Sequence, residues 1–236
     1  MMAGTLYIVA TPIGNLEDIT FRALKTLKEV DLILAEDTRE TKKILNNFQI
    51  KKILLSLHQH SGLQRYNYIL SLLNEGKNLA LVSEAGTPGI SDPGNKLISY
   101  LLSQNKEIKV VPIPGACALV TALSISGFPS DRFIFLGFIP RKKKRKKFLE
   151  EIIKADKTVV FYESTYRIVK TLTELKDFEK VFVNPPSASW RSGKKIMVAR
   201  ELTKKFETIY RGELREVIEE IKKHPLKGEF VVVVSN

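Results

Sequence analysis

The chain has 236 residues, 44% of them hydrophobic, which is enough for two modest α/β domains or one large one. Its single cysteine excludes an intrachain disulfide, and no apolar stretch approaches the roughly 20 residues that a membrane span needs. The N-terminus has no basic region of the signal-peptide kind, so we expect a cytoplasmic protein without a membrane partner. The net charge of +12 favours an acidic partner, most commonly nucleic acid.

The first half of the chain alternates apolar strand segments with amphipathic helices. Strands are predicted at residues 6–10, 31–35, 53–57, 79–83 and 108–113. Helices are predicted at 21–30, from the cluster at 36–41 to Phe48, at 63–73 and 96–102, and in an Ala-rich segment that ends near Gly127. This repeated β-α-β pattern predicts a mostly parallel five-stranded sheet with helices on both faces.

The second half of the chain does not repeat the regular β-α-β pattern, and its strand segments predict a mixed sheet. Strands are expected at 133–138, 158–162, 180–183, 196–200, 208–210 and 230–234. Helices are expected from the basic run to Ile153, at 168–175 and at 213–223, and residues 184–195 read as an exposed loop. The sequence therefore predicts two α/β domains, residues 1–115 and 116–236, with the boundary between Gly115 and Arg132.

A glycine-rich stretch at residues 82–94, VSEAGTPGISDPG, follows the fourth predicted strand. Glycine allows a backbone to approach a ligand, and backbone N–H groups left free in such a loop can hold an anionic group. Asp92 followed by Pro93 is typical of a helix N-cap and first turn. An ordinary connection is the alternative, but it needs only about two to six residues. The first strand is followed by Gly14 alone, without a dinucleotide fingerprint, and a Walker motif is absent.

Seven consecutive cations stand at residues 141–147, directly after a predicted strand that ends in Pro140. They account for seven of the twelve excess positive charges. A solvated loop is the common explanation of such a run. Its position beside a strand end also suits contact with RNA phosphates, and Tyr166 and Trp190 are aromatic residues that suit stacking on an unpaired base.

Six stretches, in this order, resemble the ribosomal RNA small-subunit methyltransferase I family of the tetrapyrrole-methylase-like superfamily. They are LYIVATPIGNLEDIT (6–20), AEDTR (35–39), SEAGTPGISDPG (83–94), PIPGA (112–116), FYES (161–164) and ARELTKKFE (199–207). The resemblance spans nearly the whole chain. It implies two α/β domains with S-adenosylmethionine (SAM) in the cleft between them, methylation of a cytidine ribose 2′-hydroxyl in small-subunit (16S) rRNA or the 30S subunit, and a homodimer. The chain departs from the family at Glu84, where Asp is usual, and at Tyr166, where His is common.

The resemblance also carries over cofactor contacts position by position. The superfamily's Gly-Gly-Asp loop matches Ala85, Gly86 and Thr87. The complete set that the resemblance implies is Pro12, Ile13, Glu84, Ala85, Gly86, Thr87, Ile90, Pro114, Gly115, Cys117, Ala118, Tyr162, Glu163 and Leu202.

A neutral ribose hydroxyl is a poor nucleophile, so a base or a cation that stabilises the alkoxide is expected. The cluster of Glu36, Asp37 and Arg39 offers both, with Asp37 as the base and Arg39 as the partner of a phosphate or alkoxide. The alternative is a surface ion pair with Thr38 as a helix N-cap. The expected RNA-binding residues are Arg141, Lys142, Lys143, Lys144, Arg145, Lys146 and Lys147.

Two further groups of polar residues are candidates for a functional role. His58 and His60 would face one side of a strand, but without a third ligand they make a weak metal site. We expect no metal and interpret them as residues that contact RNA or line a cleft. Arg200, Glu201 and Lys204 form a charged cluster that suits either a site or a soluble strand edge. Two rival functions remain: a methyltransferase that acts on a tetrapyrrole, and a ribosome-binding protein without catalytic activity.

Overall fold

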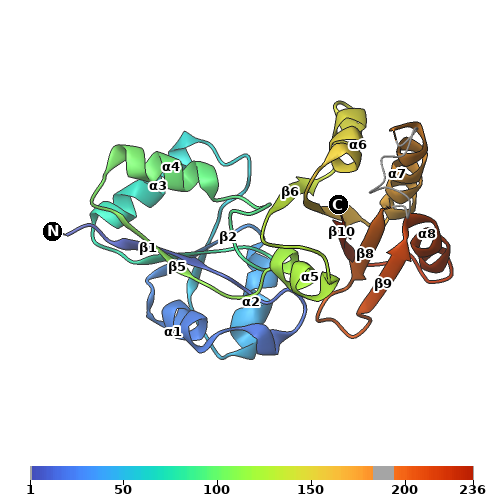
Figure 1. The fold of residues 1–236 in the computed structure, drawn as a ribbon. Helices are drawn as coiled ribbons and strands as arrows, with labels where there is room; N and C mark the ends of the chain where they lie inside the picture. The colour runs from blue at the N-terminus through green and yellow to red at the C-terminus, as the bar shows by residue number, and fades with distance from the viewer. Residues whose placement is uncertain (1, 183–193, 236) are drawn as a thin grey trace. The chain divides into compact units, whose positions relative to one another are not determined.

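The computed structural model describes residues 2–182 and 194–235. Side chains are described for residues 2–178 and 194–235. The chain divides into two compact units, Met1–Cys117 and Ala118–Asn236 (Figure 1). Each unit contains one five-stranded sheet. In the described part of the chain, no helix has both the length and the apolar character needed to cross a bilayer.

The first unit is a parallel sheet in the order β3-β2-β4-β1-β5. Its elements, in chain order, are β1 (Thr5–Val9), the 3₁₀ turn η1 (Leu16–Asp18), α1 (Phe21–Glu29), β2 (Leu32–Ala35), α2 (Thr38–Asn47), β3 (Ile53–Ser56), α3 (Leu63–Asn74), β4 (Leu79–Val82), α4 (Asn95–Gln104) and β5 (Lys109–Ile113). This confirms the predicted parallel sheet.

The central strand β4 shows why the sheet is covered on both faces. All four of its residues are buried, because alternate side chains of a strand point to opposite faces. Leu79 and Leu81 pack in one hydrophobic cluster with residues of α3 and α4, and Ala80 and Val82 pack in another with residues of α1 and α2. Because all five strands are parallel, their carboxyl ends meet at one edge of the sheet, where ligands of open α/β sheets bind.

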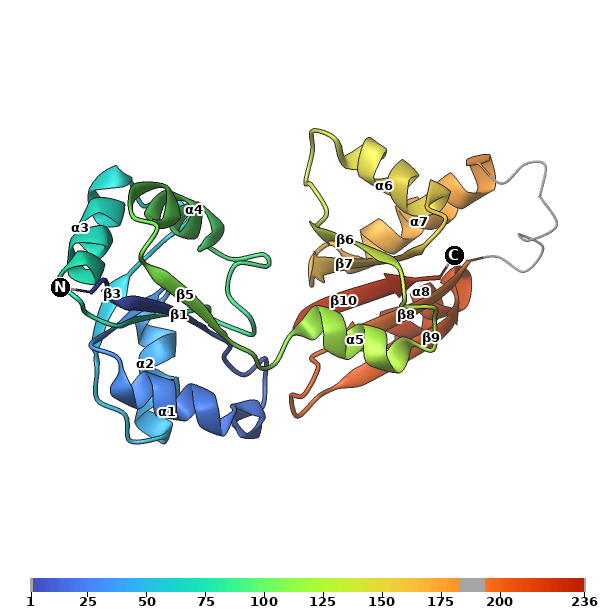
Figure 2. The ribbon, with the colours of Figure 1, turned by 60° about the vertical axis from the view of Figure 1, so that its left-hand side comes forward.

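The second unit is a mixed sheet in the order β6-β7-β10-β8-β9, in which only β6 and β7 are parallel. Its elements are α5 (Ala118–Ser126), β6 (Phe133–Phe138), α6 (Arg145–Lys154), β7 (Thr158–Ser164), α7 (Ile168–Phe182), β8 (Lys195–Arg200), β9 (Thr208–Glu213), α8 (Leu214–Lys222) and β10 (Glu229–Val234). Helices α6, α7 and α8 share one hydrophobic core with the sheet, and Figure 2 shows α5 on the opposite face.

Several predicted elements were wrong. Residues 180–182 continue α7 and do not form a strand, and residues 141–144 precede α6, which begins at Arg145. Strand β3 ends at Ser56, so His58 and His60 lie in the following turn and not on one side of a strand. The expected loop at 184–195 lies outside the described residues up to 193, as does Trp190, and Lys195 already belongs to β8.

Candidate functional site

Hydrogen bonds tie together the loops that follow β1, β4 and β5, three neighbouring strands of the first sheet. Thr11 and Gly86 form an isolated antiparallel bridge, with N···O distances of 2.9 and 3.1 Å. The Ser83 hydroxyl donates to the Gly86 carbonyl over 2.9 Å, and the Thr87 hydroxyl donates to the Ala116 carbonyl over 3.1 Å. The structure therefore brings the predicted cofactor positions of these three loops together, although they are far apart in sequence.

Gly86 is needed because the loops approach so closely. Its φ is +83°, and a Cβ atom there would lie 3.1 Å from Ile13 Cγ2 and 3.3 Å from the Ala116 carbonyl oxygen. A side chain at Gly115 would likewise meet the Ala10 Cβ at 2.9 Å. Because the Gly86 N–H is donated to Thr11, it is not free to hold an anion, which corrects the expectation for this residue.

The other end of the glycine-rich loop also differs from the prediction. Asp92 does not cap the following helix; Gly94 is the N-cap of α4, with a φ of +149° and no side-chain capping bond. The Asn95 amide instead ties the loop by donating to the Gly89 carbonyl over 2.8 Å. Ile90, a predicted cofactor contact, is exposed in this loop.

The predicted cofactor positions of the first unit differ in exposure. Pro12, Ile13 and Gly86 are buried where the loops meet, and Thr87 and Cys117 are partly buried. Exposed positions beside them, which a ligand can reach, are Glu84, Ala85, Pro114 and Gly115.

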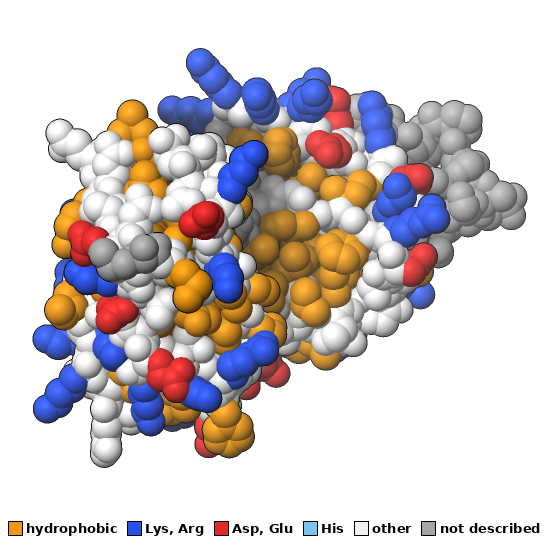
Figure 3. All heavy atoms as spheres, turned by 90° about the vertical axis from the view of Figure 1, so that its left-hand side faces the viewer, with side chains coloured by type: hydrophobic (Ala, Val, Ile, Leu, Met, Phe, Trp, Pro, Cys, Tyr) orange, Lys and Arg blue, Asp and Glu red, His pale blue; other side chains and the backbone are white. Residues whose placement is uncertain are grey.

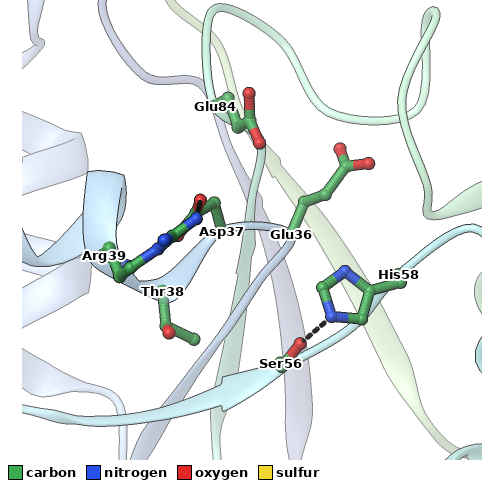
Figure 4. Close-up of a pocket in the computed structure, with 7 residues that line it drawn as sticks. All are labelled: Glu36, Asp37, Thr38, Arg39, Ser56, His58 and Glu84. Atoms are coloured by element: carbon green, nitrogen blue, oxygen red, sulfur yellow. Dashed lines mark hydrogen bonds and ion pairs between the residues drawn. The ribbon is translucent and has the colours of Figure 1, made fainter.

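A pocket of about 370 Å³ lies at the carboxyl ends of β2, β3 and β4. Its lining residues are Glu36, Asp37, Thr38, Arg39, Ser56, His58 and Glu84 (Figure 4). The charged cluster that the sequence singled out thus lines a cavity in the same unit as the glycine-rich loop. Figure 4 shows Arg39 turned toward Asp37, and the carboxylates of Glu36 and Glu84 standing apart from that pair.

Asp37 is the N-cap of α2, a role that the sequence analysis gave to Thr38. Its Oδ1 accepts from the Arg39 backbone N–H over 2.8 Å and from Nε over 3.1 Å, and its Oδ2 accepts from Nη2 over 2.7 Å. The hydrogen bonds from the Arg39 side chain and backbone hold the Asp37 pKa well below its usual range. Such a carboxylate stays charged and orients Arg39, but it is a weak proton acceptor.

Glu36, next to Asp37, has the opposite electrostatic environment. Burial is the main cause that raises its pKa, and the Glu84 carboxylate adds to the effect while His58 opposes it. Asp92 belongs to the same acidic group: burial, then Glu36 and Glu84, raise its pKa to about 6. A carboxylate with a raised pKa is the better base near neutral pH.

His58 lines the pocket, in agreement with its interpretation from sequence as a cleft-lining residue. Its Nε2 lies 2.6 Å from the Ser56 Oγ, and its backbone N–H donates to the Ser61 hydroxyl over 2.8 Å. The two bonds hold the ring at the pocket wall. The signal in the sequence is a polar residue that closely follows an apolar strand; Glu36 after β2 has the same signal. Among the described residues, no three His, Cys, Asp or Glu side chains are grouped to hold a metal ion.

The predicted cofactor contacts of the second unit have unlike surroundings. Tyr162 is half-buried, and its hydroxyl accepts from the Leu119 N–H over 3.2 Å at the start of α5, the helix that Ala118 begins. Glu163 is different, because its side chain is fully buried and pairs with Arg167 over 2.7 Å. Leu202 is buried as well. The geometry favours a structural role for Glu163.

The seven cations of the basic run are not equivalent. The Arg145 side chain is only 11% exposed and pairs with Glu174 over 2.6 Å. It also donates to the Thr171 hydroxyl and the Pro140 carbonyl. The remaining cations, Arg141, Lys142, Lys143, Lys144, Lys146 and Lys147, are exposed. Figure 3 shows Lys and Arg side chains along the upper margin of the face it draws, at the height of α6 in Figure 1.

The second charged cluster is satisfied internally. The Lys204 ammonium group lies 3.0 Å from Glu201 Oε1 and 2.8 Å from Glu229 Oε2. The Arg200 Nε donates to the Lys227 carbonyl over 2.7 Å. These bonds join the ends of β8 and β10, which supports the structural alternative for this cluster.

Comparison with solved structures places this fold among methyltransferases. Cobalt precorrin-4 methyltransferase superposes with a TM-score of 0.69 at 17% identity, over 98% of this chain and 94% of that one. A uroporphyrin-III C-methyltransferase from Thermus thermophilus, complexed with S-adenyl homocysteine, gives a TM-score of 0.62 at 17% identity, over 99% and 98%. At these identities the likeness concerns the fold. The family model for tetrapyrrole (corrin/porphyrin) methylases matches residues 5–218.

Sequence relatives narrow the class. Proteins named ribosomal RNA small subunit methyltransferase I are 45% identical in Thermotoga maritima, over 98% of both chains, and 47% identical in Halalkalibacterium halodurans, over 98% of this chain and 76% of that one. The relative in Escherichia coli O157:H7 is 44% identical, over 98% and 78%. The chain therefore belongs to the ribosomal RNA small subunit methyltransferase I group of the tetrapyrrole methylase family, as the sequence motifs predicted.

Proposed function

We propose that this protein is a SAM-dependent methyltransferase that methylates the 2′-hydroxyl of a cytidine ribose in small-subunit rRNA. The observation that carries the proposal is 44–47% identity, over 98% of this chain, to relatives named ribosomal RNA small subunit methyltransferase I. The choice of the ribose hydroxyl rests on the family resemblance and on a pocket that offers both a carboxylate with a raised pKa and an arginine.

The residues at the carboxyl ends of β1, β4 and β5 fit a small zwitterionic cofactor. The loops are held at fixed spacing by the Thr11–Gly86 bridge, and the exposed backbone at Ala85 and Gly115 borders them. When bound, SAM supplies a methyl group that is already activated for transfer. We assign its binding in the first unit to Pro12, Ile13, Glu84, Ala85, Gly86, Thr87, Ile90, Pro114, Gly115 and Cys117, and in the second to Ala118, Tyr162 and Leu202.

In the pocket, we assign proton acceptance to Glu36 in preference to Asp37. Glu36 accepts the proton of the ribose hydroxyl, because its raised pKa brings it closer to neutral pH. Asp37 fixes the Arg39 guanidinium, which faces the phosphate or the developing alkoxide. The base role that the sequence analysis gave to Asp37 thus moves by one residue, and Asp37 becomes a positioning residue.

Methyl transfer can be tested with radiolabelled SAM and three acceptors: free 16S rRNA, 30S particles and a uroporphyrinoid. We expect label in RNA, released as 2′-O-methylcytidine on nuclease digestion. Label in the macrocycle would support the rival tetrapyrrole methyltransferase, and no label in any acceptor would support the non-catalytic ribosome-binding protein. A Glu36→Gln variant should bind S-adenosylhomocysteine normally and lose most methyl transfer.

We also propose a homodimer, which the family resemblance implies, and a cytoplasmic location, which the single cysteine favours. Light scattering coupled to size-exclusion chromatography should give twice the chain mass of 26.7 kDa. A mass of one chain at micromolar concentration would remove the dimer from the proposal.

A further inference from the structure

Three aromatic rings share one face of the second sheet, at the end of β6. The centroid of the Tyr162 ring lies 5.0 Å from that of Phe135 and 5.4 Å from that of Phe138, both in edge-to-face geometry. Phe138 is 55% exposed, whereas Phe135 and Tyr162 are partly buried. Tyr162 therefore contacts both phenylalanine rings, and Phe138 is the exposed outer ring of the three.

A β-bulge places Phe138 on this face. Phe135 pairs with Val160, and the next recorded pair is Phe138 with Tyr162, so β6 has one residue more than β7 over this interval. Gly137, with a φ of +62°, supplies the left-handed backbone that the irregularity needs. Without the extra residue, positions 135 and 138 would point to opposite faces. Bulges of this kind re-aim a side chain, often beside a functional site.

The chain directly after Phe138 is fixed, and it leads into the basic run. Arg167 Nη1 donates to the Ile139 carbonyl over 2.7 Å, and Arg145 Nη1 donates to the Pro140 carbonyl over 3.2 Å. Thr171 and Glu163 link the two arginines: the Thr171 hydroxyl accepts from Arg145 and donates to Glu163, which pairs with Arg167. This buried network holds both ends of residues 139–145.

The cations that this segment presents are available to a ligand. Arg141, Lys142 and Lys143 are exposed, and no ion pair engages any of the three within the part of the chain that the structure describes. They begin three residues beyond Phe138 and are anchored by the same network. An exposed aromatic ring beside unpaired cations is the combination that binds single-stranded nucleic acid, because the ring stacks on a base and the cations neutralise phosphates.

We propose that Phe138 and residues 141–143 form a binding site for an unpaired RNA nucleotide. Its base stacks on the Phe138 ring, and the adjoining phosphates contact Arg141, Lys142 and Lys143. The positive charge favours RNA over an apolar protein partner, because an apolar surface would bury three adjacent cations without compensating their charge. The site deepens the proposed function, since it rests on RNA as the substrate, and it names a contact that lies outside the pocket of Glu36.

Fluorescence anisotropy with a labelled single-stranded RNA of roughly 12 nucleotides tests the stacking contact. We expect Phe138→Ala to lower the affinity of the full-length protein about 5- to 100-fold, the range for loss of one stacking aromatic. Phe138→Tyr should keep the affinity, and Phe138→Leu should behave like Phe138→Ala, since leucine has no ring to stack. Phe21→Ala removes a phenylalanine of α1 that is even more exposed than Phe138, and it should have no effect.

The cations have a separate readout. Replacing Lys142 and Lys143 by glutamine should reduce the slope of log K against log salt by about 1.4, or roughly 0.7 for each phosphate contact with a single strand. A matched double replacement of Lys25 and Lys28, on α1, should leave the slope unchanged.

Several results would overturn the site. They are unchanged RNA affinity in Phe138→Ala, wild-type affinity in Phe138→Leu, or loss of S-adenosylhomocysteine affinity in Phe138→Ala with RNA affinity intact. The last result would assign the ring to the cofactor. Failure of the proposed function is distinguishable, because the wild-type protein would then transfer no methyl group to RNA whether or not the oligonucleotide binds through Phe138.

Discussion

Arg145 should be a stability residue, although it stands in the middle of seven cations. Arg145→Met keeps the length and apolar stem of the side chain and removes its charge. The change breaks the 2.6 Å pair with Glu174 and the 2.8 Å hydrogen bond to the Thr171 hydroxyl. It also frees the Pro140 carbonyl, so both ends of the connection from β6 to α6 lose an anchor.

The expected loss follows from burial. Removing one partner of a buried ion pair costs about 3–5 kcal/mol, because the other charge is left without compensation. Glu174 keeps 30% of its side-chain surface exposed and also lies 4.0 Å from the Lys170 ammonium group, so its charge is compensated in part and we expect about 2–3 kcal/mol. For a unit of this size, that corresponds to a fall of roughly 8–12 °C in the unfolding midpoint.

Thermal unfolding followed by circular dichroism measures the effect, with Lys146→Met as the matched control. Lys146 is the next residue on α6 and is exposed, so its replacement should change stability by no more than about 0.5 kcal/mol. Arg145→Met combined with Glu174→Met should recover part of the loss, because no unpaired charge remains. If Arg145→Met and Lys146→Met unfold at the same temperature, the distinction drawn within the basic run is mistaken.

Three other substitutions test the first unit. Gly86→Ala should destabilise by about 1–2 kcal/mol through its positive φ and weaken S-adenosylhomocysteine binding in calorimetry, whereas Gly62→Ala, whose added Cβ meets no atom within 4 Å, should do neither. Asp92→Asn should flatten the pH dependence of stability. The folded state of the wild type binds more protons between the ordinary pKa of 3.8 and the raised pKa of about 6, so its unfolding free energy falls as pH rises through this window, and thermal melts should show the variant above the wild type only at higher pH. Asp37→Asn keeps an N-cap for α2 but releases Arg39, so it should leave the unfolding midpoint unchanged and reduce methyl transfer less than Glu36→Gln does; equal loss in the two variants would return the base role to Asp37.

The fold could be predicted from the sequence where hydrophobic patterning and turn residues indicated the same element. Strands β1, β2 and β4 are short apolar runs bounded by turn residues, and their order with the helices implied a parallel sheet. The strand prediction at 180–183 failed because a short apolar run does not distinguish a strand from the last turn of a helix, and α7 continues to Phe182. Asp92 failed as a cap because Gly94 and the Asn95 amide determine where α4 begins.

The site could be predicted only as a set of strand ends. That parallel strands bring residues 11–13, 84–87 and 114–117 to one edge follows from topology, but the Thr11–Gly86 bridge depends on loop conformations that no local pattern encodes. The same holds for the basic run, since Arg145 differs from its neighbours only through Thr171 and Glu174, which lie 26 and 29 residues further along the chain.

The two neighbouring carboxylates at the end of β2 explain why we assign the base role to Glu36, whereas the sequence analysis assigned it to Asp37. Both follow an apolar strand, but the helix geometry of α2 turns the Asp37 oxygens toward the backbone and side chain of Arg39. Glu36 precedes the helix and is not held by those donors; burial, and then the charge of Glu84, raise its pKa and disfavour its ionised form. Adjacent acids with pKa values displaced in opposite directions divide two tasks between them, so that one stays charged to orient a cation while the other exchanges a proton. In the proposed function, Asp37 caps α2 and orients Arg39, which leaves Glu36 as the carboxylate that accepts the proton.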